Sequence, residues 1–346
     1  MTTREDRIKG VLVGMATGDA LGVPYELGKR VPDSGPVMEG GGYGFAPGEW
    51  SDDTQQAICV ARGRSDPDLV AGELLAWYRS GPADVGPTTG ATLARVPRNT
   101  PVTAAHMAFE AAKARRGRAE GQISNGSLMR TGPACLPFLG DRKRIAEAAR
   151  AISNLTHYDP YAGDACVLWS LAIDLAVTDD SRGWSVQSLV RHGCQHIPHE
   201  RQDFWREVIA ESLSLARHPS RRGQADPAPP RSLTSNLNVV KAFGAALYAV
   251  ELAQRPGSPW GPGLPAGLVH AVRIGGDTDT VAAIAGALLG AIYGASAVPA
   301  DWRKQLHGWP GDIKADDLET LAVQAAYGSS GQHGELGTDD PEEYLP

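Results

Sequence analysis

Apolar residues recur every three to four positions along almost the whole chain, and this spacing constrains the fold more than any other feature. Alternation of apolar and polar residues, which predicts strands, is almost absent. The pattern therefore predicts an all-α protein of about a dozen helices. The expected helices cover residues 7–19, 54–64, 68–79, 103–116, 141–153, 163–177, 185–192, 202–216, 239–252, 266–273 and 278–293.

Two segments interrupt the helical pattern. Residues 31–50 are dense in Gly and Pro, and residues 218–235 are rich in Pro, Arg and Ser, so we expect the second segment to be a mobile surface loop. Neither segment is a convincing linker, and the chain contains no internal repeat. We therefore expect one compact domain over residues 1–325, followed by an acidic C-terminal tail over residues 326–346.

Charge and cysteine content exclude several classes of protein. The formal net charge of −7 disfavours a dedicated surface for nucleic acid or for an anionic membrane. The four cysteines, Cys59, Cys135, Cys166 and Cys194, form no CxxC pair, so neither a zinc site nor a redox motif is indicated. We expect them to be buried thiols in a reducing compartment, the cytoplasm.

Residues 281–298 carry no charge and contain Gly286, Gly290 and Gly294 at the spacing of a membrane helix-dimer motif. The segment is rich in Ala and Gly, however, and is only weakly hydrophobic for a membrane span. Asp277 and Asp279 also lead directly into it. We expect a buried core helix whose glycines allow another backbone to approach closely, and no membrane association.

The block Trp50-Ser51-Asp52-Asp53-Thr54 places two carboxylates side by side before an expected helix. Adjacent carboxylates repel each other unless a positive charge lies between them. Ser and Asp are also favoured N-cap residues, because their oxygens accept hydrogen bonds from the free amides of the first turn. Taken alone, the block is explained better by capping than by a binding site.

A second cluster, Gly275-Gly276-Asp277-Thr278-Asp279-Thr280, stands directly before an apolar helix. Capping explains one of its aspartates but not two aspartates together with two threonines. Such a dense group of oxygens before a buried helix needs compensating positive charge. Because Mg²⁺, Mn²⁺ and Ca²⁺ prefer oxygen ligands, this cluster predicts a site for a hard divalent cation.

The two clusters together offer enough oxygens for about two six-coordinate cations, with water completing the coordination. Two such cations would lower the pKa of a water that they share. Two further acidic residues, Glu26 and Asp84, lie in expected turns. For these two, a solvated surface glutamate and ordinary turn chemistry are alternative explanations.

Five motifs in this order resemble those of the ADP-ribosylglycohydrolase family, and the similarity spans roughly residues 5–295. One such motif is weak, but five in order are specific for the family. The motifs are Gly18-Asp19-Ala20-Leu21-Gly22 with Glu26, Trp50-Ser51-Asp52-Asp53-Thr54, Asn125-Gly126-Ser127-Leu128-Met129-Arg130, Thr156-His157 and Gly275-Gly276-Asp277-Thr278-Asp279-Thr280.

The resemblance implies a compact orthogonal bundle of helices that holds two Mg²⁺ or Mn²⁺ ions. The metal ligands implied by the matching motifs are Glu26, Ser51, Asp52, Asp53, Asp277, Asp279 and Thr280. The implied ADP-ribose contacts are Asn125, Gly126, Ser127 and Leu128 around the phosphates, His157, and Tyr158 or Tyr161 against the adenine. The implied catalytic residues are Glu26, Asp53 and Asp84. For His157 alone, a structural histidine is the simpler interpretation.

The sequence departs from the family pattern at two places. Ser51 stands where many members have Thr, which keeps the hydroxyl. Pro87 stands in the turn that begins at Asp84, where bacterial members commonly have Asn, and it removes both a side-chain amide and a backbone donor. Substrate contacts around Asp84 are therefore expected to differ from those of the family.

The resemblance predicts a hydrolase that releases ADP-ribose from an ADP-ribosylated protein or small molecule. Arginine-linked ADP-ribose is the favoured substrate, and serine-linked or nucleobase-linked ADP-ribose is the alternative. A rival interpretation from another class is a non-catalytic ADP-ribose-binding module. Such a module would keep the loop at Asn125 but lose the metal carboxylates, all of which are present.

Overall fold

The computed structural model describes residues 2–26, 28–97, 101–116, 123–181, 185–218, 228–255 and 260–328. This part of the chain is helical except for loops and one antiparallel pair of two-residue strands, β1 (His307–Gly308) and β2 (Ile313–Lys314). The all-α prediction is therefore confirmed. The α-helices are α1 (Arg4–Gly22), α2 (Asp52–Arg62), α3 (Pro67–Arg79), α4 (Pro87–Leu93), α5 (Ala104–Arg116), α6 (Arg142–Asn154), α7 (Pro160–Thr178), α8 (Val186–Arg191), α9 (His199–Arg217), α10 (Val239–Leu252), α11 (Leu264–Arg273), α12 (Thr278–Tyr293), α13 (Ala300–Gln305) and α14 (Ala315–Tyr327).

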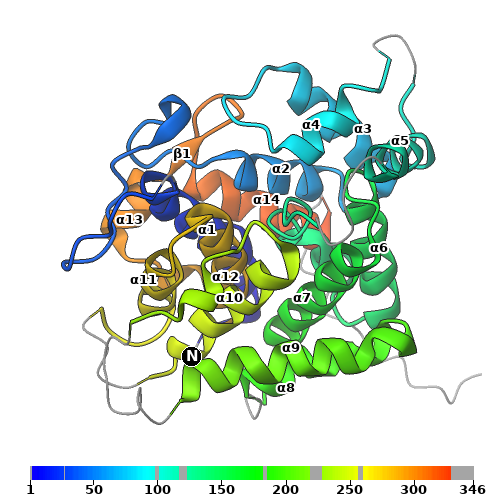
Figure 1. Ribbon diagram of the computed structural model, residues 1–346. Helices are drawn as coiled ribbons and strands as arrows, with labels where there is room; N and C mark the ends of the chain where they lie inside the picture. The colour runs from blue at the N-terminus through cyan, green and yellow to red at the C-terminus, as the bar shows by residue number, and fades with distance from the viewer. Residues whose placement is uncertain are drawn as a thin grey trace, which may run out of the picture.

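Helices α1 and α12 form the centre of the bundle, and α7, α10, α11 and α14 pack around this pair (Figure 1). Glycines line the contact between the two central helices. A Cβ atom built on Gly290 would lie 1.8 Å from the carbonyl oxygen of Gly10, and one on Gly286 would lie 2.2 Å from that of Gly14. This close approach confirms the role that the sequence predicts for the glycines of residues 281–298, and it brings the first and last parts of the fold together.

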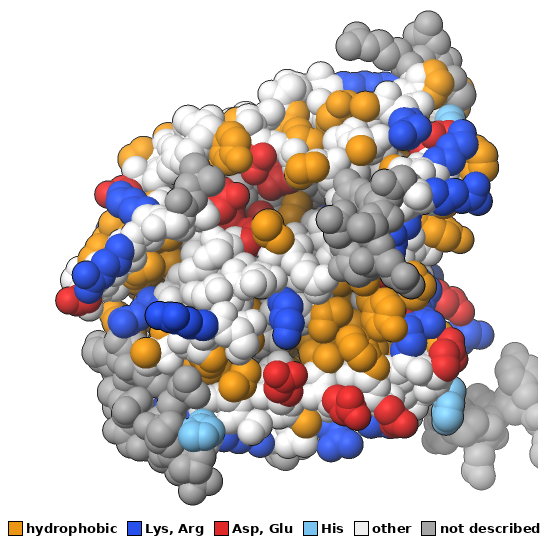
Figure 2. Space-filling model, in the orientation of Figure 1, with side chains coloured by type: hydrophobic (Ala, Val, Ile, Leu, Met, Phe, Trp, Pro, Cys, Tyr) orange, Lys and Arg blue, Asp and Glu red, His pale blue; other side chains and the backbone are white. Residues whose placement is uncertain are grey.

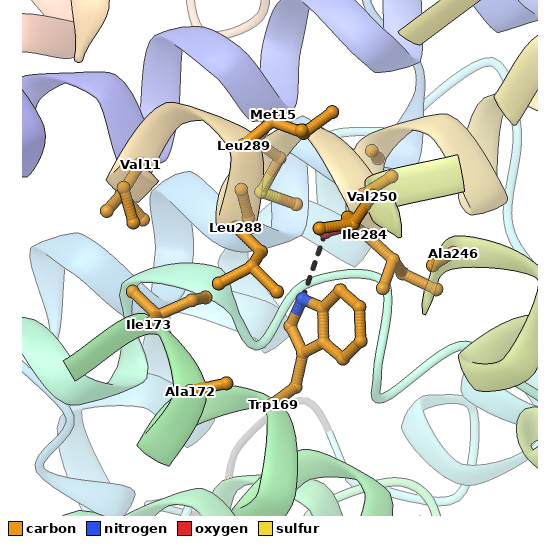
Figure 3. Packing of buried hydrophobic residues seen from close by; sticks show 14 of the residues in the cluster. Val11, Met15, Trp169, Ala172, Ile173, Ala246, Val250, Ile284, Leu288 and Leu289 are labelled. Atoms are coloured by element: carbon orange, nitrogen blue, oxygen red, sulfur yellow. Dashed lines mark hydrogen bonds between the residues drawn. The ribbon is translucent and has the colours of Figure 1, made fainter. Parts of the chain in front are cut away.

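Trp169 of α7 anchors the surrounding helices to this central pair. Its side chain is fully buried, and its indole Nε1 donates a hydrogen bond of 2.9 Å to the backbone carbonyl of Ile284 in α12. Figure 3 shows the ring between Leu288 and Ile284 of α12 and Val250 of α10. The hydrogen bond satisfies the only polar atom of a large apolar side chain, so the indole stabilises the core without an unpaired donor.

All eleven expected helices are present. Six of them, α1, α2, α3, α7, α9 and α11, begin one to three residues earlier than the apolar spacing predicts, α10 and α12 begin at the predicted residue, and α5, α6 and α8 begin one residue later. Helix α1 is capped by Thr3, whose hydroxyl accepts from the amide of Asp6, and α7 is capped by Asp159 with Pro160 at its first position. Polar caps and prolines lie outside the apolar pattern, so for helices such as α1 and α7 periodicity alone places the start too late. Three helices were not predicted: α4, α13 and α14.

The predicted loops and tail are only partly described by the structure. Residues 31–50 contain one short 3₁₀ turn, Gly42–Gly44, and no α-helix, as expected. Within residues 218–235, a 3₁₀ turn covers Arg231–Leu233, and residues 219–227 lie outside the described part. Helix α14 extends to Tyr327, and the proposed acidic tail beyond residue 328 also lies outside it.

All four cysteines are buried free thiols, as the sequence predicts. Among the described helices, α7 is long and apolar enough to cross a membrane by length and composition, but 83% of its apolar window is buried inside the protein. A core helix of a soluble protein passes the same test, so α7 is weak evidence for a span. Helix α12, which covers most of residues 281–298, is shorter, at 16 residues.

His270 of α11 is expected to make stability depend on pH. Its side chain is 3% exposed, and burial followed by the charges of Arg273 and Arg255 lowers its pKa from 6.5 to about 4. Between these two values the unfolded chain binds a proton at His270 that the folded protein excludes. This contribution is therefore fully present above pH 6.5 and is lost as the pH falls, by about 3 kcal/mol at pH 4.

The measurement compares urea unfolding of the wild type and His270→Met at several pH values. We expect the difference in free energy of unfolding between them to change with pH in this window. His199→Gln, at an exposed histidine, serves as the control and should follow the wild-type profile. A His270→Met profile parallel to that of the wild type would show that His270 is not responsible.

Candidate active site

A cleft of about 400 Å³ opens where the first turns of α2, α4 and α12 meet. Figure 2 shows acidic side chains gathered in a hollow in the upper half of the displayed face. The residues that line the cleft are Glu26, Tyr43, Asp52, Asp53, Asp84, Gly86, Pro87, Thr88, Thr89, Ser124, Asn125, Gly126, Met129, His157, Leu237, Asp277, Asp279 and Thr280. The two aspartate clusters predicted from the sequence thus belong to one site.

The start of α2 shows that Asp52 and Asp53 are not helix caps. Ser51 is the N-cap residue, and Asp19 of α1 accepts hydrogen bonds from the amides of Ser51 and Thr54 at 2.9 and 3.0 Å. The hydroxyl of Thr54 also donates to Asp19, at 2.6 Å. Because these residues satisfy the amides of the first turn, the carboxylates of Asp52 and Asp53 are left for another purpose.

The start of α12 is shaped by the two glycines before it. Gly275 and Gly276 have φ values of 77° and 79°, a left-handed conformation that glycine adopts without strain. The turn lets the side chain of Asn236 accept from the amide of Asp277 at 2.8 Å and donate to the carbonyl of Gly275 at 2.9 Å. The side chain of Asp277 makes no capping bond to α12, so its carboxylate can face the cleft.

Thr278 fastens the start of α12 to the end of α1. Its hydroxyl donates to the carbonyl of Gly22 at 2.8 Å. A Cβ atom on Gly22 would lie 2.3 Å from the Cα atom of Asp279, so only glycine permits this approach. The contact makes Asp279 a member of two groups of carboxylates. One group is Asp19, Asp53 and Asp279, and the other is Glu26, Asp277 and Asp279. Within each group, one oxygen of every carboxylate lies within 4.8 Å of the others.

Burial and mutual repulsion raise the pKa values of these carboxylates. The pKa values of Asp52, Asp53 and Asp279 lie well above the usual range, first because burial removes water and then because neighbouring carboxylates repel one another. Burial and then the charges of Asp277, Asp84 and Asp19 raise the pKa of Glu26 to about 7. Burial also raises the pKa of Asp84, and Asp277 adds to this. The site therefore attracts positive charge.

The donor set fits a hard divalent cation. Oδ1 of Asp53 is buried and has no hydrogen-bond partner among the described residues, although its Oδ2 accepts from the hydroxyl of Ser51 at 3.0 Å. A buried carboxylate oxygen without a donor is costly unless a cation binds it. The surrounding ligands are carboxylates and a threonine hydroxyl, the oxygen donors that Mg²⁺ and Mn²⁺ prefer.

The opposite wall of the cleft is built from hydroxyls, an amide and an imidazole. His157 Nε2 lies 2.8 Å from the hydroxyl of Ser124, which lies 2.9 Å from that of Thr88. A Cβ atom on Gly126 would lie 2.9 Å from His157 Nε2, so this glycine lets the loop pack against the ring. These three side chains also line a small adjoining pocket of about 20 Å³ with Tyr158 and with Arg115 of α5.

Asn125 connects the two walls. Its amide nitrogen donates to Oδ2 of Asp277 at 2.7 Å and to the carbonyl of Asn236 at 2.9 Å. Its backbone amide donates to the carbonyl of Leu237, which holds the loop at Asn125 beside the start of α10. Asn125 therefore fixes the ligand-side loop against the acidic cluster.

The structure does not bring every predicted side chain to the cleft. Ser127 is fully buried, and its hydroxyl accepts from Ser153 at 2.9 Å inside the core. Leu128 is 1% exposed and packs in the core, and Tyr161 stacks edge-on against Phe204. Ser51 is buried beside Asp53 and is absent from the cleft surface. Tyr158 reaches the adjoining pocket and is half exposed.

The sequence predicts no role for several residues of the site, among them Asp19, Tyr43, Ser124 and Leu237. Asp19 lies within one of the five sequence motifs, but the motif alone does not show that it approaches Asp53 and Asp279. Helix α1 continues to Gly22 and places Asp19 in the acidic cluster. Tyr43 and Leu237 line the cleft from loops, and both are exposed, at 55% and 72%. No short-range sequence pattern indicates them, because they come from segments far apart in the chain.

Comparison with known proteins places this site in a family context. A family model described as ADP-ribosylglycohydrolase matches residues 1–334. The ADP-ribosyl-[dinitrogen reductase] glycohydrolase of Rhodospirillum rubrum is 26% identical, covering 87% of this chain and 90% of that protein. The ADP-ribosylarginine hydrolase of Pseudomonas putida (strain GB-1) is 26% identical, covering 92% and 79%. A solved structure titled "ADP-ribosylglycohydrolase-related protein complex" has a TM-score of 0.66 and 27% identity, covering 95% of this chain and all of that one.

Proposed function

Because the chain belongs to the ADP-ribosylglycohydrolase family, we propose that it hydrolyses the glycosidic bond between ADP-ribose and an arginine side chain and releases ADP-ribose. The observation that carries the proposal is the convergence of Glu26, Asp52, Asp53, Asp277 and Asp279 on one cleft whose other wall is neutral and polar. A module that only binds ADP-ribose would have no need of so costly a group of buried carboxylates.

The residues proposed to hold two Mg²⁺ or Mn²⁺ ions share oxygen side chains in or beside the cleft: Glu26, Asp52, Asp53, Asp277, Asp279 and Thr280, with Ser51 next to Asp53. When bound, such ions lower the pKa of water and orient oxygens of the substrate. Asp19 is buried beneath Asp53 and Asp279, but both of its oxygens accept hydrogen bonds from α2, so we assign it the role of holding that helix in place.

The other residues of the cleft bind and orient the substrate. The hydroxyls of Ser124 and Thr88 and the loop at Asn125 are placed to receive the phosphates and the ribose. Glu26 and Asp84 lie half-buried at the mouth, where we propose that they exchange protons with the leaving group and water. Cleavage passes through an oxocarbenium-like state, and the anionic wall stabilises its positive charge.

Arginine linkage is favoured by the charge at the mouth of the cleft. Glu26 and Asp84 line this opening together with the exposed ring of Tyr43. A guanidinium leaving group is cationic and complements two carboxylates and an aromatic face, whereas a serine hydroxyl is neutral. The Pseudomonas putida relative is by name an ADP-ribosylarginine hydrolase, which supports the same choice.

The test measures released ADP-ribose by mass spectrometry with arginine-, serine-, cysteine- and nucleobase-linked ADP-ribose as substrates, with and without EDTA. We expect the fastest release from the arginine-linked substrate and none in EDTA, because the acidic cluster needs its cations. Faster release from a serine- or nucleobase-linked substrate would show that the preferred linkage is that one and not arginine.

Two variants decide between hydrolysis and binding alone. Asp52→Ala and Asp279→Ala each remove one carboxylate from the cation site, so both should lose cation-dependent release. If both keep full release, the assignment of the active site is wrong. If the wild type binds ADP-ribose with Mg²⁺ or Mn²⁺ present but releases none from any substrate, the chain is a binding module.

A further inference from the structure

Arg130 lies between the two walls of the cleft and touches neither substrate space nor solvent. Its side chain is fully buried. Its Nη1 donates to Oε1 of Gln56 at 2.7 Å, and its Nη2 donates to Oγ1 of Thr156 at 2.8 Å and to the carbonyl of Ile152 at 3.1 Å. Within the described residues no carboxylate pairs with this guanidinium directly. A buried charge held only by neutral acceptors is costly, which suggests a role beyond packing.

The first arm from Arg130 leads to the metal side. Oε1 of Gln56 accepts the hydrogen bond from Arg130. Nε2 of Gln56 donates a second one, of 2.7 Å, to Oδ2 of Asp52. A guanidinium only donates, so the Gln56 amide must turn its Oε1 toward Arg130, and its Nε2 therefore faces Asp52. Arg130 thereby fixes, through Gln56, which oxygen of Asp52 accepts from this amide, and so holds the carboxylate in one orientation at the cleft.

The second arm leads to the ligand side. Thr156 Oγ1 accepts from Arg130 and lies 2.8 Å from Nδ1 of His157. Thr156 is 1% exposed, so its hydroxyl proton is satisfied by donating to Nδ1. Nδ1 is then an acceptor, and the neutral imidazole carries its proton on Nε2, which donates to the hydroxyl of Ser124 at 2.8 Å.

We propose that Arg130 is a positioning residue that sets the hydrogen-bond polarity of both walls at once, through Gln56 to Asp52 and through Thr156 to His157 and Ser124. The proposal rests on the proposed function for its two ligands, a divalent cation and ADP-ribose. Burial lowers the pKa of Arg130 to about 10, so the guanidinium stays protonated at neutral pH and acts only as a donor.

The main test replaces Arg130 with methionine, which keeps much of the volume and removes every donor. Three readouts need no turnover: the ¹⁵N NMR shifts of the His157 ring, Mn²⁺ affinity by EPR, and ADP-ribose affinity by calorimetry. We expect His157 to become a mixture of tautomers and the Kd for Mn²⁺ to rise about 10- to 100-fold. ADP-ribose affinity should fall as well, since the proton on Nε2 is no longer fixed.

Arg7→Met is the matched control. Arg7 is also a buried arginine, 2% exposed, but it donates to the carbonyl of Val177 and pairs with Asp180, away from the cleft. It should lose stability without changing the His157 tautomer or either affinity. Equal changes in Arg7→Met and Arg130→Met would show a general loss of structure and overturn the proposal.

Two milder variants test each arm separately and keep the proposal testable if Arg130→Met does not fold. Gln56→Met should weaken Mn²⁺ binding and leave the His157 tautomer unchanged. Thr156→Val should alter the tautomer and ADP-ribose binding and leave Mn²⁺ affinity unchanged. Wild-type values for both variants would overturn the proposal.

Arg130→Lys separates orientation from charge. Lysine keeps the positive charge but lacks the planar fork that reaches Gln56, Ile152 and Thr156 together, so we expect it to resemble Arg130→Met. Full recovery of the tautomer and both affinities would mean that charge alone matters, which contradicts the proposal. Failure of the proposed hydrolase function would be recognised separately, as an absence of ADP-ribose release by the wild type.

Discussion

Replacing Asp279 with asparagine is expected to slow cation-dependent ADP-ribose release severely and to stabilise the protein when no cation is present. Asp279 is 3% exposed and belongs to both groups of close carboxylates. Removing its charge relieves repulsion that only a cation otherwise offsets. Loss of the cation site removes several kcal/mol of transition-state stabilisation, which lowers the rate on the order of a thousandfold.

Thermal unfolding in EDTA and in excess Mn²⁺ measures both the stability without cation and the stability gained when Mn²⁺ binds. The wild type should gain about 2.7 kcal/mol when Mn²⁺ exceeds its Kd a hundredfold, and Asp279→Asn should gain almost nothing. The control is Asp174→Asn, at a buried carboxylate that accepts from the amide of Gly140 outside the cleft. Asp174→Asn should respond to Mn²⁺ as the wild type does. A lower melting temperature for Asp279→Asn in EDTA would instead make Asp279 a structural residue.

Replacing Gly290 with alanine is expected to cost about 3 kcal/mol or more of folding free energy. The added Cβ atom would lie 1.8 Å from the carbonyl oxygen of Gly10 and 2.4 Å from its carbonyl carbon. Both are backbone atoms of a helix, so no side-chain rotation relieves the clash, and α1 and α12 must separate. Because α12 begins at Thr278, next to Asp277, this movement should also weaken the response to cations.

Urea unfolding of Gly290→Ala and Gly72→Ala provides a matched pair of helix substitutions. Gly72 lies inside α3, and a Cβ atom there would meet no atom within 4 Å. Gly72→Ala should therefore stabilise the protein by about 0.5 to 1 kcal/mol through helix propensity alone. A Gly290→Ala protein as stable as the wild type would mean that the two helices are not packed through their glycines.

The sequence predicts the long helices well because their apolar spacing reflects burial against one core. It fails for α4, whose seven residues, Pro87–Leu93, are mostly small and polar and complete less than two turns of periodicity. Helix α14, in contrast, is long enough for its apolar spacing to predict it. Leu318, Ala322 and Ala325 are buried at helical spacing, and the pattern was available in the sequence.

The site illustrates a different limit. Each aspartate pair could be read locally, but only the fold shows that Ser51 and Asp19 cap α2 and free Asp52 and Asp53. Whether Asp52 and Asp53 cap the helix depends on contacts between residues more than thirty positions apart, which no local sequence pattern contains. Ser127 shows the same limit. The sequence motif implies that it contacts the ligand, but in the fold its hydroxyl accepts a hydrogen bond from Ser153 in the core.

The pairing of α1 with α12 has a consequence for how the protein is made. The hydrogen bond between Thr278 and Gly22 joins residues 256 positions apart, and Asp19 and Asp279 belong to one carboxylate group. A ribosome-bound chain therefore exposes the apolar and glycine-lined faces of α1 until nearly three hundred residues have been synthesised. Such late, long-range closure is typical of slow folding and of nascent chains that need chaperones. The proposed cation site cannot be completed before Asp277 and Asp279 have been synthesised, because both belong to its carboxylate groups.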